Sequence, residues 1–190
     1  MGRAHFEHAD FLEAARKLAI AHGPAAVTVG SVTQHLGAPT GSFYHRFASR
    51  DVLLAELWLT TVLQFQEGFF AAIEAGDWLA AALHTPHWAR ANLEAACFLL
   101  LHHRDDFVRG EWPPALKQRV VAQARQVESC VKRFARETFK STDSSHLRRA
   151  SFVLLEVPLA AVRPHLRRAE PPPAIVDELI RTTYAAIIDA

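Results

Sequence analysis

Polar side chains suited to contacting a nucleic acid gather around two phenylalanines between residues 40 and 50. Phe43 and Phe47 lie four residues apart, which is the spacing of a buried face on a helix. The side chains around them can exchange hydrogen bonds or carry positive charge: Thr40, Ser42, Tyr44, His45, Arg46 and Arg50. A short helix of this kind would turn its aromatic rings inward and offer its polar groups to a partner.

A second short helix is expected just before it, over residues 28–36. Thr28 can cap this helix, because its hydroxyl accepts a hydrogen bond from an unpaired N–H of the first turn. Its apolar face would be formed by Val29, Val32 and Leu36. Gly37 can end the helix in the left-handed conformation, and Ala38 and Pro39 form the turn. Two short helices joined by a tight glycine-containing turn are the sequence form of a helix-turn-helix DNA-binding motif.

The segment 37–51 resembles the N-terminal domain of the TetR family of bacterial transcriptional regulators. The family pattern has two glycines, a hydroxyl residue, an apolar residue and a tyrosine, followed by a phenylalanine, a serine, a basic and an acidic residue. The chain reads GAPTGSFYHRFASRD. Upstream, the segment 11–23 is similar to the family's first helix. Pro39 replaces a usual serine and Gly30 a frequent charged residue, which leaves the base preference open.

This resemblance implies an all-α protein in two domains. Residues 1–50 would form a three-helix helix-turn-helix DNA-binding domain, and residues 51–190 a helical bundle for ligand binding and dimerisation. A homodimer would bind a palindromic double-stranded DNA operator, since the symmetry of a C2 dimer matches that of a palindrome. A small apolar or amphipathic effector would bind the body and release the DNA, and repression is the commoner mode of action in the family.

The DNA-binding residues carried over by the resemblance lie on the two short helices and at the start of the next: Thr28, Pro39, Thr40, Gly41, Ser42, Tyr44, His45, Arg46 and Arg50. Tyr44 resembles the family's phosphate-contacting tyrosine, and it can equally be a half-buried packing residue. Arg46 can read a guanine or touch only the DNA backbone. Arg50 stands where a helix N-terminus favours an anion, so we expect a phosphate contact there.

Positive charge is concentrated in this part of the chain. Between Ala14 and Arg50 there are four basic and no acidic residues, whereas from Asp51 onward there are 16 basic and 17 acidic residues. The formal net charge of the whole chain is only +1. A local positive field is what attraction to phosphates requires.

The composition indicates a globular, helical protein. The 190 residues suffice for one or two small domains with a buried core, and half of them are hydrophobic. Strand-like alternation is scarce, and no apolar run approaches the ~20 residues of a membrane span. The N-terminus lacks the apolar stretch of a secretory signal, and Cys97 and Cys130 do not form a disulfide framework. We therefore expect a cytoplasmic protein without a membrane partner.

Beyond a long fourth helix, the pattern predicts further helices at 78–102, 115–139, 146–162 and 173–189. Pro86 is expected to split or kink the first of these, because proline removes a backbone donor and clashes with the preceding turn. Loops are expected where proline, glycine or polar residues gather, at 104–114, 140–145 and 163–173.

Some side chains of these helices are candidates for the lining of a ligand pocket: Trp88, Phe98, His102, Trp112 and Phe134. Each can equally be an ordinary core residue. The run 102–106 also raises a metal or hydrolytic site. However, adjacent histidines on a helix point roughly 100° apart and cannot easily share one ion. We expect no metal and no cofactor.

The last two helices carry apolar faces that suit a dimer interface: Phe152, Leu155, Leu159 and Val162 on one, and Leu179, Tyr184 and Ile187 on the other. In the family, such terminal helices pair with their copies in a second subunit. Packing within one chain predicts the same pattern.

Three functions are compatible with the sequence. The leading one is a ligand-responsive regulator that acts on DNA without catalysis, and the second keeps DNA binding but uses the body only for dimerisation. The third is a helical-bundle enzyme that uses the run His102–Asp106. It lacks a nucleophile–base pair, a phosphate-binding glycine loop and metal-ligand spacing, and it leaves the helix-turn-helix unexplained.

Overall fold

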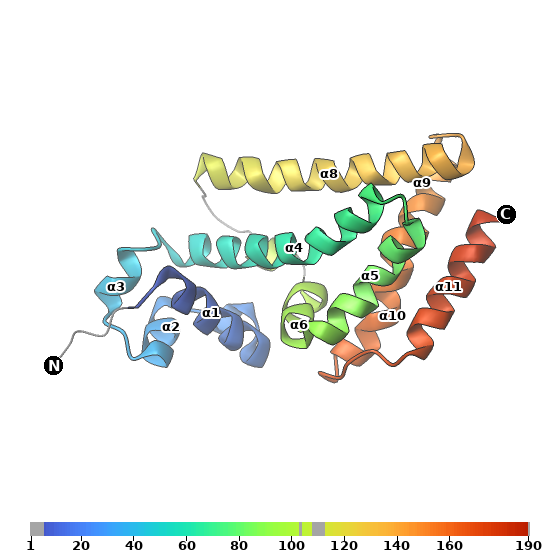
Figure 1. Ribbon diagram of the computed structural model, residues 1–190. Helices are drawn as coiled ribbons and strands as arrows, with labels where there is room; N and C mark the ends of the chain where they lie inside the picture. The colour runs from blue at the N-terminus through green and yellow to red at the C-terminus, as the bar shows by residue number, and fades with distance from the viewer. Residues whose placement is uncertain (1–5, 103, 108–112, 190) are drawn as a thin grey trace. The chain divides into compact units, whose positions relative to one another are not determined.

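The computed structural model describes residues 6–102, 104–107 and 113–189 of the chain. All regular structure in these residues is helical, without a strand, which confirms the all-α prediction (Figure 1). None of the described helices is both long and apolar enough to cross a membrane.

Two compact units share the chain. The first, which we call the head unit, comprises Met1–Val62 and His102–Gln118. The second, the body unit, comprises Leu63–Leu101 and Arg119–Ala190. The boundary expected after residue 50 concerns functional domains and stays a prediction.

Three fully buried phenylalanine rings form the centre of the head unit. The first elements of the chain are α1 (His8–His22), the 3-10 turn η1 (Pro24–Ala26), α2 (Val29–Leu36), α3 (Thr40–Tyr44) and α4 (Arg50–Glu74). The ring of Phe11 on α1 lies 5.9 Å from that of Phe43 and 6.1 Å from that of Phe47, and the latter two are 5.4 Å apart. The two contacts of Phe11 are edge-on, and such contacts add to the stabilisation from burial. They fix the short helix α3 against α1.

Helix α5 lies at the centre of the body unit. The unit's elements are α5 (Trp78–Ala91), α6 (Leu93–Leu101), most of α8 (Pro114–Phe139), α9 (Ser144–Ser151), the π-helical turn η2 (Phe152–Glu156), α10 (Val157–Leu166) and α11 (Ile175–Ile188). The short α7 (Arg104–Phe107) belongs to the head unit. Both α10 and α11 pack against α5 (Figure 1). Small buried residues such as Ala81 and Ala89 on α5 allow this close approach.

The helix is not split at Pro86, where the sequence predicted a break, but ends several residues later. Pro86 is buried inside α5, which continues to Ala91. The chain leaves the helical region at Asn92, with φ −136° and ψ 53°. The side-chain amide of Asn92 donates to the carbonyl oxygen of Trp88 and so ends the helix. Packing of α5 against α6, η2, α10 and α11 outweighs the one hydrogen bond that the proline removes.

Two predicted loops are partly helical. The segment 104–114 contains α7, and α10 runs through Pro164 into the segment predicted as a loop at 163–173. The loop predicted at 140–145 is confirmed in its first half, since α9 already begins at Ser144. Its start is fixed by Asp143, whose carboxylate accepts hydrogen bonds from the N–H groups of Ser145 and His146.

A wide turn interrupts the helix predicted at 146–162. The N–H of Val157 donates to the carbonyl of Phe152, five residues back, in the π turn between α9 and α10. Pro158 follows directly and has no N–H to offer to Leu154, and its ring would clash with that carbonyl in a regular α-helix. The wider turn lets the helix continue across the proline.

Close packing between α4 and α5 depends on Gly68. A Cβ on this residue would lie 2.5 Å from Cε1 of His84. The His84 ring lies 5.0 Å from that of Phe65, and its Nε2 lies 2.5 Å from the Phe65 carbonyl oxygen, so this nitrogen must donate. Burial lowers the pKa of His84.

We expect Gly68→Ala to lower the free energy of unfolding by about 1–3 kcal/mol, because the new methyl group overpacks this contact. Urea denaturation measures the change. In a His84→Ala background the same substitution should cost less, since the imidazole is gone. An equal cost in both backgrounds would contradict the proposed clash.

Arg90 of α5 forms hydrogen bonds with the first turn of α11 and with the segment before it. Its guanidinium donates to both carboxylate oxygens of Asp177, at 2.7 and 3.0 Å. It also donates to the carbonyl oxygens of Pro172, at 2.7 Å, and Pro173, at 3.2 Å. Burial raises the pKa of the Asp177 carboxyl, but the hydrogen bonds and charge of Arg90, together with His87, outweigh it and lower the pKa.

Replacing Arg90 by leucine is expected to destabilise the protein by about 1–3 kcal/mol at neutral pH, because a half-buried carboxylate loses its charged partner. A carboxyl with a depressed folded-state pKa contributes stability above its unfolded pKa of ~3.9, and this is lost as the pH falls through the folded value. In urea denaturation, the gap between wild type and Arg90→Leu should therefore shrink from about pH 5 to about pH 2. The exposed Arg181 of α11 provides the control, and Arg181→Leu should match wild type throughout. A gap independent of pH would show that Asp177 is not the partner that matters.

Candidate nucleic-acid interface

Helix α2 begins with a reciprocal capping box. The Thr28 hydroxyl accepts a hydrogen bond from the N–H of Ser31 at 3.0 Å, and the Ser31 hydroxyl accepts one from the N–H of Thr28 at 2.8 Å. The predicted capping role of Thr28 is confirmed. Its hydroxyl therefore already makes a capping hydrogen bond to α2 in the absence of DNA.

The turn after α2 has the geometry expected of its glycine. Gly37 adopts φ 66° and ψ 26°, the left-handed conformation that side chains disfavour. The N–H groups of Gly37 and Ala38 donate to the carbonyls of Gln34 and Thr33, at 3.1 and 2.9 Å. Pro39 follows in an extended conformation and precedes α3. The turn between α2 and α3 is thus only three residues long, and its fixed geometry sets where α3 points.

Helix α3 has a buried and an exposed face. Phe43 is fully buried, whereas these predicted contact residues are exposed on or beside the helix: Pro39, Thr40, Gly41, Tyr44 and His45. Tyr44 exposes 58% of its surface and touches Phe43 edge-on at 5.4 Å. Ser42 is half-buried, and its hydroxyl donates to the carbonyl of Pro39 at 2.6 Å. The regular helix ends at Tyr44, so Phe47, which was expected on its buried face, lies beyond it, after a closing turn at His45 and Arg46.

The side chain of Arg46 packs against the head unit and makes contacts within it. Its Nη1 donates to the carbonyl of Ser42 at 2.9 Å, and its guanidinium carbon lies 5.6 Å from the centre of the Phe11 ring. This cation–π contact holds the charge close to α3. A DNA contact by Arg46 stays a prediction.

Arg50 is tied to the 3-10 turn before α2. Its Nε donates to the carbonyl oxygen of Val27, and its Nη2 donates to that of Pro24 at 2.8 Å. A third contact, at 3.3 Å, joins Nη1 to the carboxylate of Asp51. The phosphate contact expected for Arg50 stays a prediction, and the residue has a structural role that its sequence position does not reveal.

Arg50→Met should therefore lower the free energy of unfolding by about 1–3 kcal/mol, because two carbonyl oxygens lose a charged donor. Thermal and urea unfolding of the full chain measure this loss. Lys17→Met, which removes an exposed charge from α1, is the matched control and should stay within about 0.5 kcal/mol of wild type. The structural role is refuted if the two variants are equally stable.

Three of the predicted pocket residues are core residues of the body unit. Phe98 and Phe134 are fully buried and Trp88 is 9% exposed. Trp88 meets the ring of Phe65 edge-on at 5.2 Å, and Phe134 meets that of Trp78 at 5.1 Å. These contacts support the core interpretation, while a ligand role for the three residues stays a prediction.

The other two predicted pocket residues are placed differently. His102 belongs to the head unit, where its ring meets that of Phe107 at 5.7 Å. Burial lowers the pKa of His102, and the nearby charge of Asp106 opposes this shift. Trp112 lies outside the described residues, as does His103 of the histidine pair. Within the described part of the chain, no group of three or more metal-ligating side chains is close enough to hold an ion.

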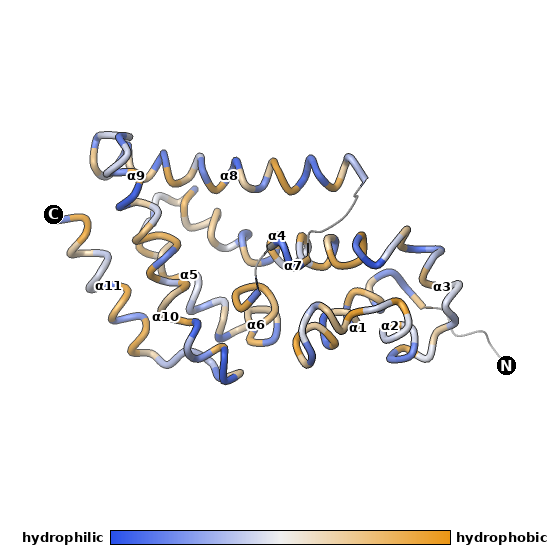
Figure 2. Tube along the Cα trace, turned by 180° about the vertical axis from the view of Figure 1, so that it is seen from behind, coloured by the Kyte–Doolittle hydropathy of each residue, from blue (hydrophilic) through white to orange (hydrophobic). Residues whose placement is uncertain are grey.

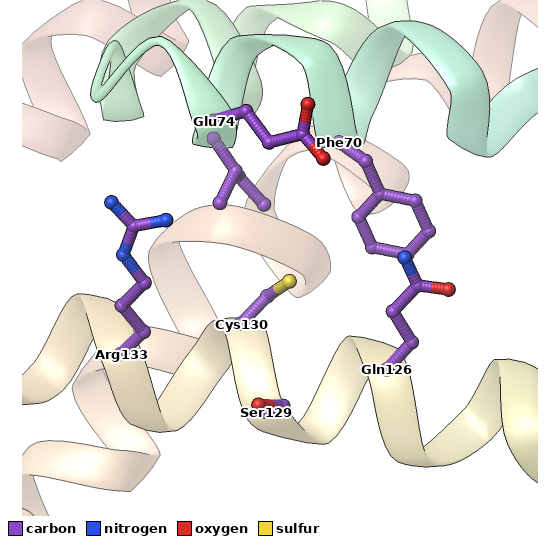
Figure 3. A pocket seen from close by; sticks show the side chains of 7 residues that line it. Phe70, Glu74, Gln126, Ser129, Cys130 and Arg133 are labelled. Carbon is purple, nitrogen blue, oxygen red and sulfur yellow. The ribbon is translucent and has the colours of Figure 1, made fainter.

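The structure adds a groove that the sequence did not predict. It lies in the body unit between α4 and α8, with a volume of about 190 Å³ (Figure 3). Its lining residues are Phe70, Ile73, Glu74, Gln126, Ser129, Cys130 and Arg133. Of the α8 residues in this lining, Cys130 alone belongs to the inward-facing stripe of the helix, whereas Gln126, Ser129 and Arg133 are exposed. The side chains that turn inward on this otherwise charged helix alternate at spacings of three and four: Val120, Gln123, Val127, Cys130 and Phe134.

The predicted dimer residues differ in exposure. Phe152 and Leu179 are exposed, by 38% and 57%. Leu155, Leu159 and Ile187 are half-buried. Val162 is fully buried in its own chain, so its side chain has no surface to offer to a second copy. Tyr184 turns inward, with its ring 6.2 Å from that of Phe134, and burial raises its pKa to about 12.

Comparison with known proteins identifies the head. Residues 11–57 match the family described as bacterial regulatory proteins, tetR family. Among curated protein sequences there is no match.

Solved structures match over nearly the whole chain. A tetR family transcription regulator from Shewanella sp. PV-4 superposes with a TM-score of 0.72 at 17% identity, covering 97% of each chain. The transcriptional regulator FadR from Bacillus subtilis, solved in complex with stearoyl-CoA, superposes with a TM-score of 0.66 at 13% identity, covering 96% of this chain and 98% of FadR. KstR2, a ketosteroid transcriptional regulator of Mycobacterium tuberculosis, superposes with a TM-score of 0.58 at 16% identity, covering 99% and 96%.

A capped α2, a left-handed glycine turn and an α3 with exposed polar groups together form a helix-turn-helix motif, an arrangement that many proteins use to bind DNA. This motif lies within the residues that match the tetR family of bacterial regulatory proteins, and over nearly its whole length the chain has the fold of a solved tetR family regulator.

Proposed function

We propose that the protein is a cytoplasmic, homodimeric repressor that binds a palindromic operator and is released from it by a small apolar or amphipathic effector. The observation that carries the proposal is the exposed polar face of α3, held outward by the burial of Phe43 and Phe47.

The first turn of α3 would enter the major groove. Thr40 and His45 are exposed and can exchange hydrogen bonds with base edges or phosphates. Gly41 has no atom within 4 Å of the position a Cβ would take, so its backbone is open to close approach. Tyr44, with its exposed hydroxyl end, is suited to a phosphate. Arg46 and Arg50 add positive charge beside them.

Dimerisation would use the outer faces of η2 and α11. Phe152, Ile175 and Leu179 are large apolar residues with 38%, 51% and 57% of their surface exposed. Exposed apolar residues near one another mark protein interfaces more often than free surface. A C2 dimer through these helices would present two heads to the two half-sites of a palindrome.

An effector of low polarity suits the body. Of two proteins with this fold, one was solved in complex with stearoyl-CoA and the other is a ketosteroid regulator, which supports an apolar or amphipathic effector here. The groove between α4 and α8 gives the body unit a place with mixed apolar and polar lining. Regulation by binding requires no catalytic group, and we propose none.

A gel shift against the DNA upstream of the protein's own gene tests the proposal. Tyr44→Ala should weaken binding about tenfold for specific and non-specific DNA alike, because a phosphate contact carries no sequence information. Lys132→Ala, on the exposed face of α8, should bind like wild type and serves as the control. Unchanged affinity in Tyr44→Ala would count against α3 as the reading helix.

The same assay separates the two regulator hypotheses. Bands released by an apolar effector would support the ligand-responsive repressor. Bands retained under every effector would favour a body that serves only for dimerisation. The stoichiometry of the shifted complex should be two chains per palindrome.

A further inference from the structure

Glu74 places an unpaired negative charge in the groove between α4 and α8. It is an exposed residue and one of those that line this groove. Among the described residues, no side chain or backbone group forms a hydrogen bond or an ion pair with its carboxylate. An ionised carboxylate can only accept hydrogen bonds, and the strongest come from charged donors. The partner that would complete this group is therefore a cation from outside the chain.

The end of α4 adds to the negative charge. Glu74 is the last residue of this helix. The aligned peptide dipoles of a helix give its C-terminus roughly half a negative elementary charge, which favours a cation beside it. The last turn of α4, which lies entirely within the described residues, carries no basic side chain. The helix itself thus supplies no cation for this end of the groove.

The positive charge in the lining is already offset. Arg133, on the α8 wall, donates from Nε to Glu137 at 2.8 Å, and its guanidinium carbon lies 5.5 Å from the centre of the Trp78 ring. The hydrogen bond and the charge of Glu137 raise the pKa of Arg133. In Figure 3 the side chain of Glu74 extends toward Phe70 and away from Arg133. Because Arg133 and Glu137 offset each other, Glu74 remains as the net charge of the lining.

The rest of the groove near Glu74 is uncharged. Phe70 and Ile73 line it from α4, and Cys130 projects from α8 toward α4 (Figure 3). Hydrophilic and hydrophobic residues alternate along α8, as expected of a helix with one side turned inward (Figure 2). Burial raises the pKa of the Cys130 thiol, while the charge of Arg133 opposes this shift and that of Glu74 adds to it. The thiol is therefore neutral at pH 7, and the charge of Glu74 acts on the centre of the groove.

The size of the groove limits its occupant. Its volume of about 190 Å³ is below the ~300–1,000 Å³ of typical ligand pockets. A single alkyl chain or one ring with a small charged group suits this volume better than a large molecule.

We propose that this groove binds an amphipathic organic amine in its ammonium form. The ammonium group pairs with the Glu74 carboxylate near the Phe70 ring, whose face also attracts a cation. The hydrocarbon part lies against Phe70 and Ile73. The inference rests on the proposed function in that this amine would be the effector, but its binding can be measured without DNA.

Three probes of eight carbons each isolate the charge. At pH 7 octylammonium is positive, 1-octanol is neutral and octanoate is negative. Calorimetric titration of the full-length protein should show octylammonium binding about fivefold more tightly than octanol, the ratio that one partly exposed ion pair produces. Octanoate should bind most weakly. The preference for octylammonium should disappear in about 1 M NaCl, because salt screens an exposed pair.

Glu74→Gln tests the carboxylate, since it keeps the shape of the side chain and removes its charge. In this variant octylammonium should bind no more tightly than octanol. Glu94→Gln is the matched control, because Glu94 is an exposed glutamate of the body unit outside the groove lining, and it should keep the preference. The proposal is overturned by equal binding of octylammonium and octanol to wild type, by a preference that survives in Glu74→Gln, or by octanoate binding more tightly than octylammonium.

The location of the groove needs its own test. Methylthiolation of Cys130 by methyl methanethiosulfonate is followed by peptide mass spectrometry, which separates it from the buried Cys97. The reaction should slow at least threefold in saturating octylammonium, because the bound chain covers the thiol. An unchanged rate overturns the assignment to this groove, even if Glu74→Gln alters octylammonium binding.

A gel shift with octylammonium distinguishes failure of this inference from failure of the proposed function. Release of DNA from wild type but not from Glu74→Gln supports both. Binding of octylammonium that depends on Glu74, without release of DNA, supports the site and refutes its role as an effector site. Release of DNA by another effector, without any octylammonium binding, refutes the site and leaves the repressor proposal intact.

Discussion

The burial of Phe43 and Phe47 against Phe11 is the constraint on which the proposed DNA-binding surface depends. A helix of five residues cannot hold its own conformation, because nucleation costs more than so few hydrogen bonds return. Its orientation must come from tertiary contacts, and the three rings supply them. Once two rings of this segment are fixed inside, Tyr44 and His45 between them can only face outward. The polar surface is thus a consequence of the apolar core beneath it.

The same cluster also positions charge. Arg46 lies over the Phe11 ring and bonds the chain at Ser42, and Arg50 bonds two carbonyls of the turn before α2. Both arginines therefore make stabilising contacts within the head unit, whether or not they also contact a partner. Their positive charges are held in fixed places, so binding a phosphate would cost less side-chain entropy than ordering a free arginine.

Local features were predictable from sequence, and distant ones were not. The Thr28 cap and the Gly37 turn each depend on residues no more than three positions apart. Over such short distances the conformational preferences of the residues decide the structure. The helix split predicted at Pro86 does not occur, because tertiary packing decides whether a helix continues through a proline. The bond between Arg90 and Asp177 joins residues that are 87 positions apart. The groove arises where α4 and α8 approach each other, and no single residue type in the sequence predicts it. Sequence periodicity could place one face of α8 against the body, but not the empty volume beside Cys130.

The π turn at 152–156 bears on how this chain should be aligned with relatives. Such a turn fits one extra residue into a helix, which offsets the faces before and after it by roughly 100°. A relative with a regular helix here would have one residue fewer at this point, so the alignment gap belongs inside the helix. A gap placed in the following loop instead would shift every position of α10, and would equate the half-buried Leu159 with a residue that points elsewhere.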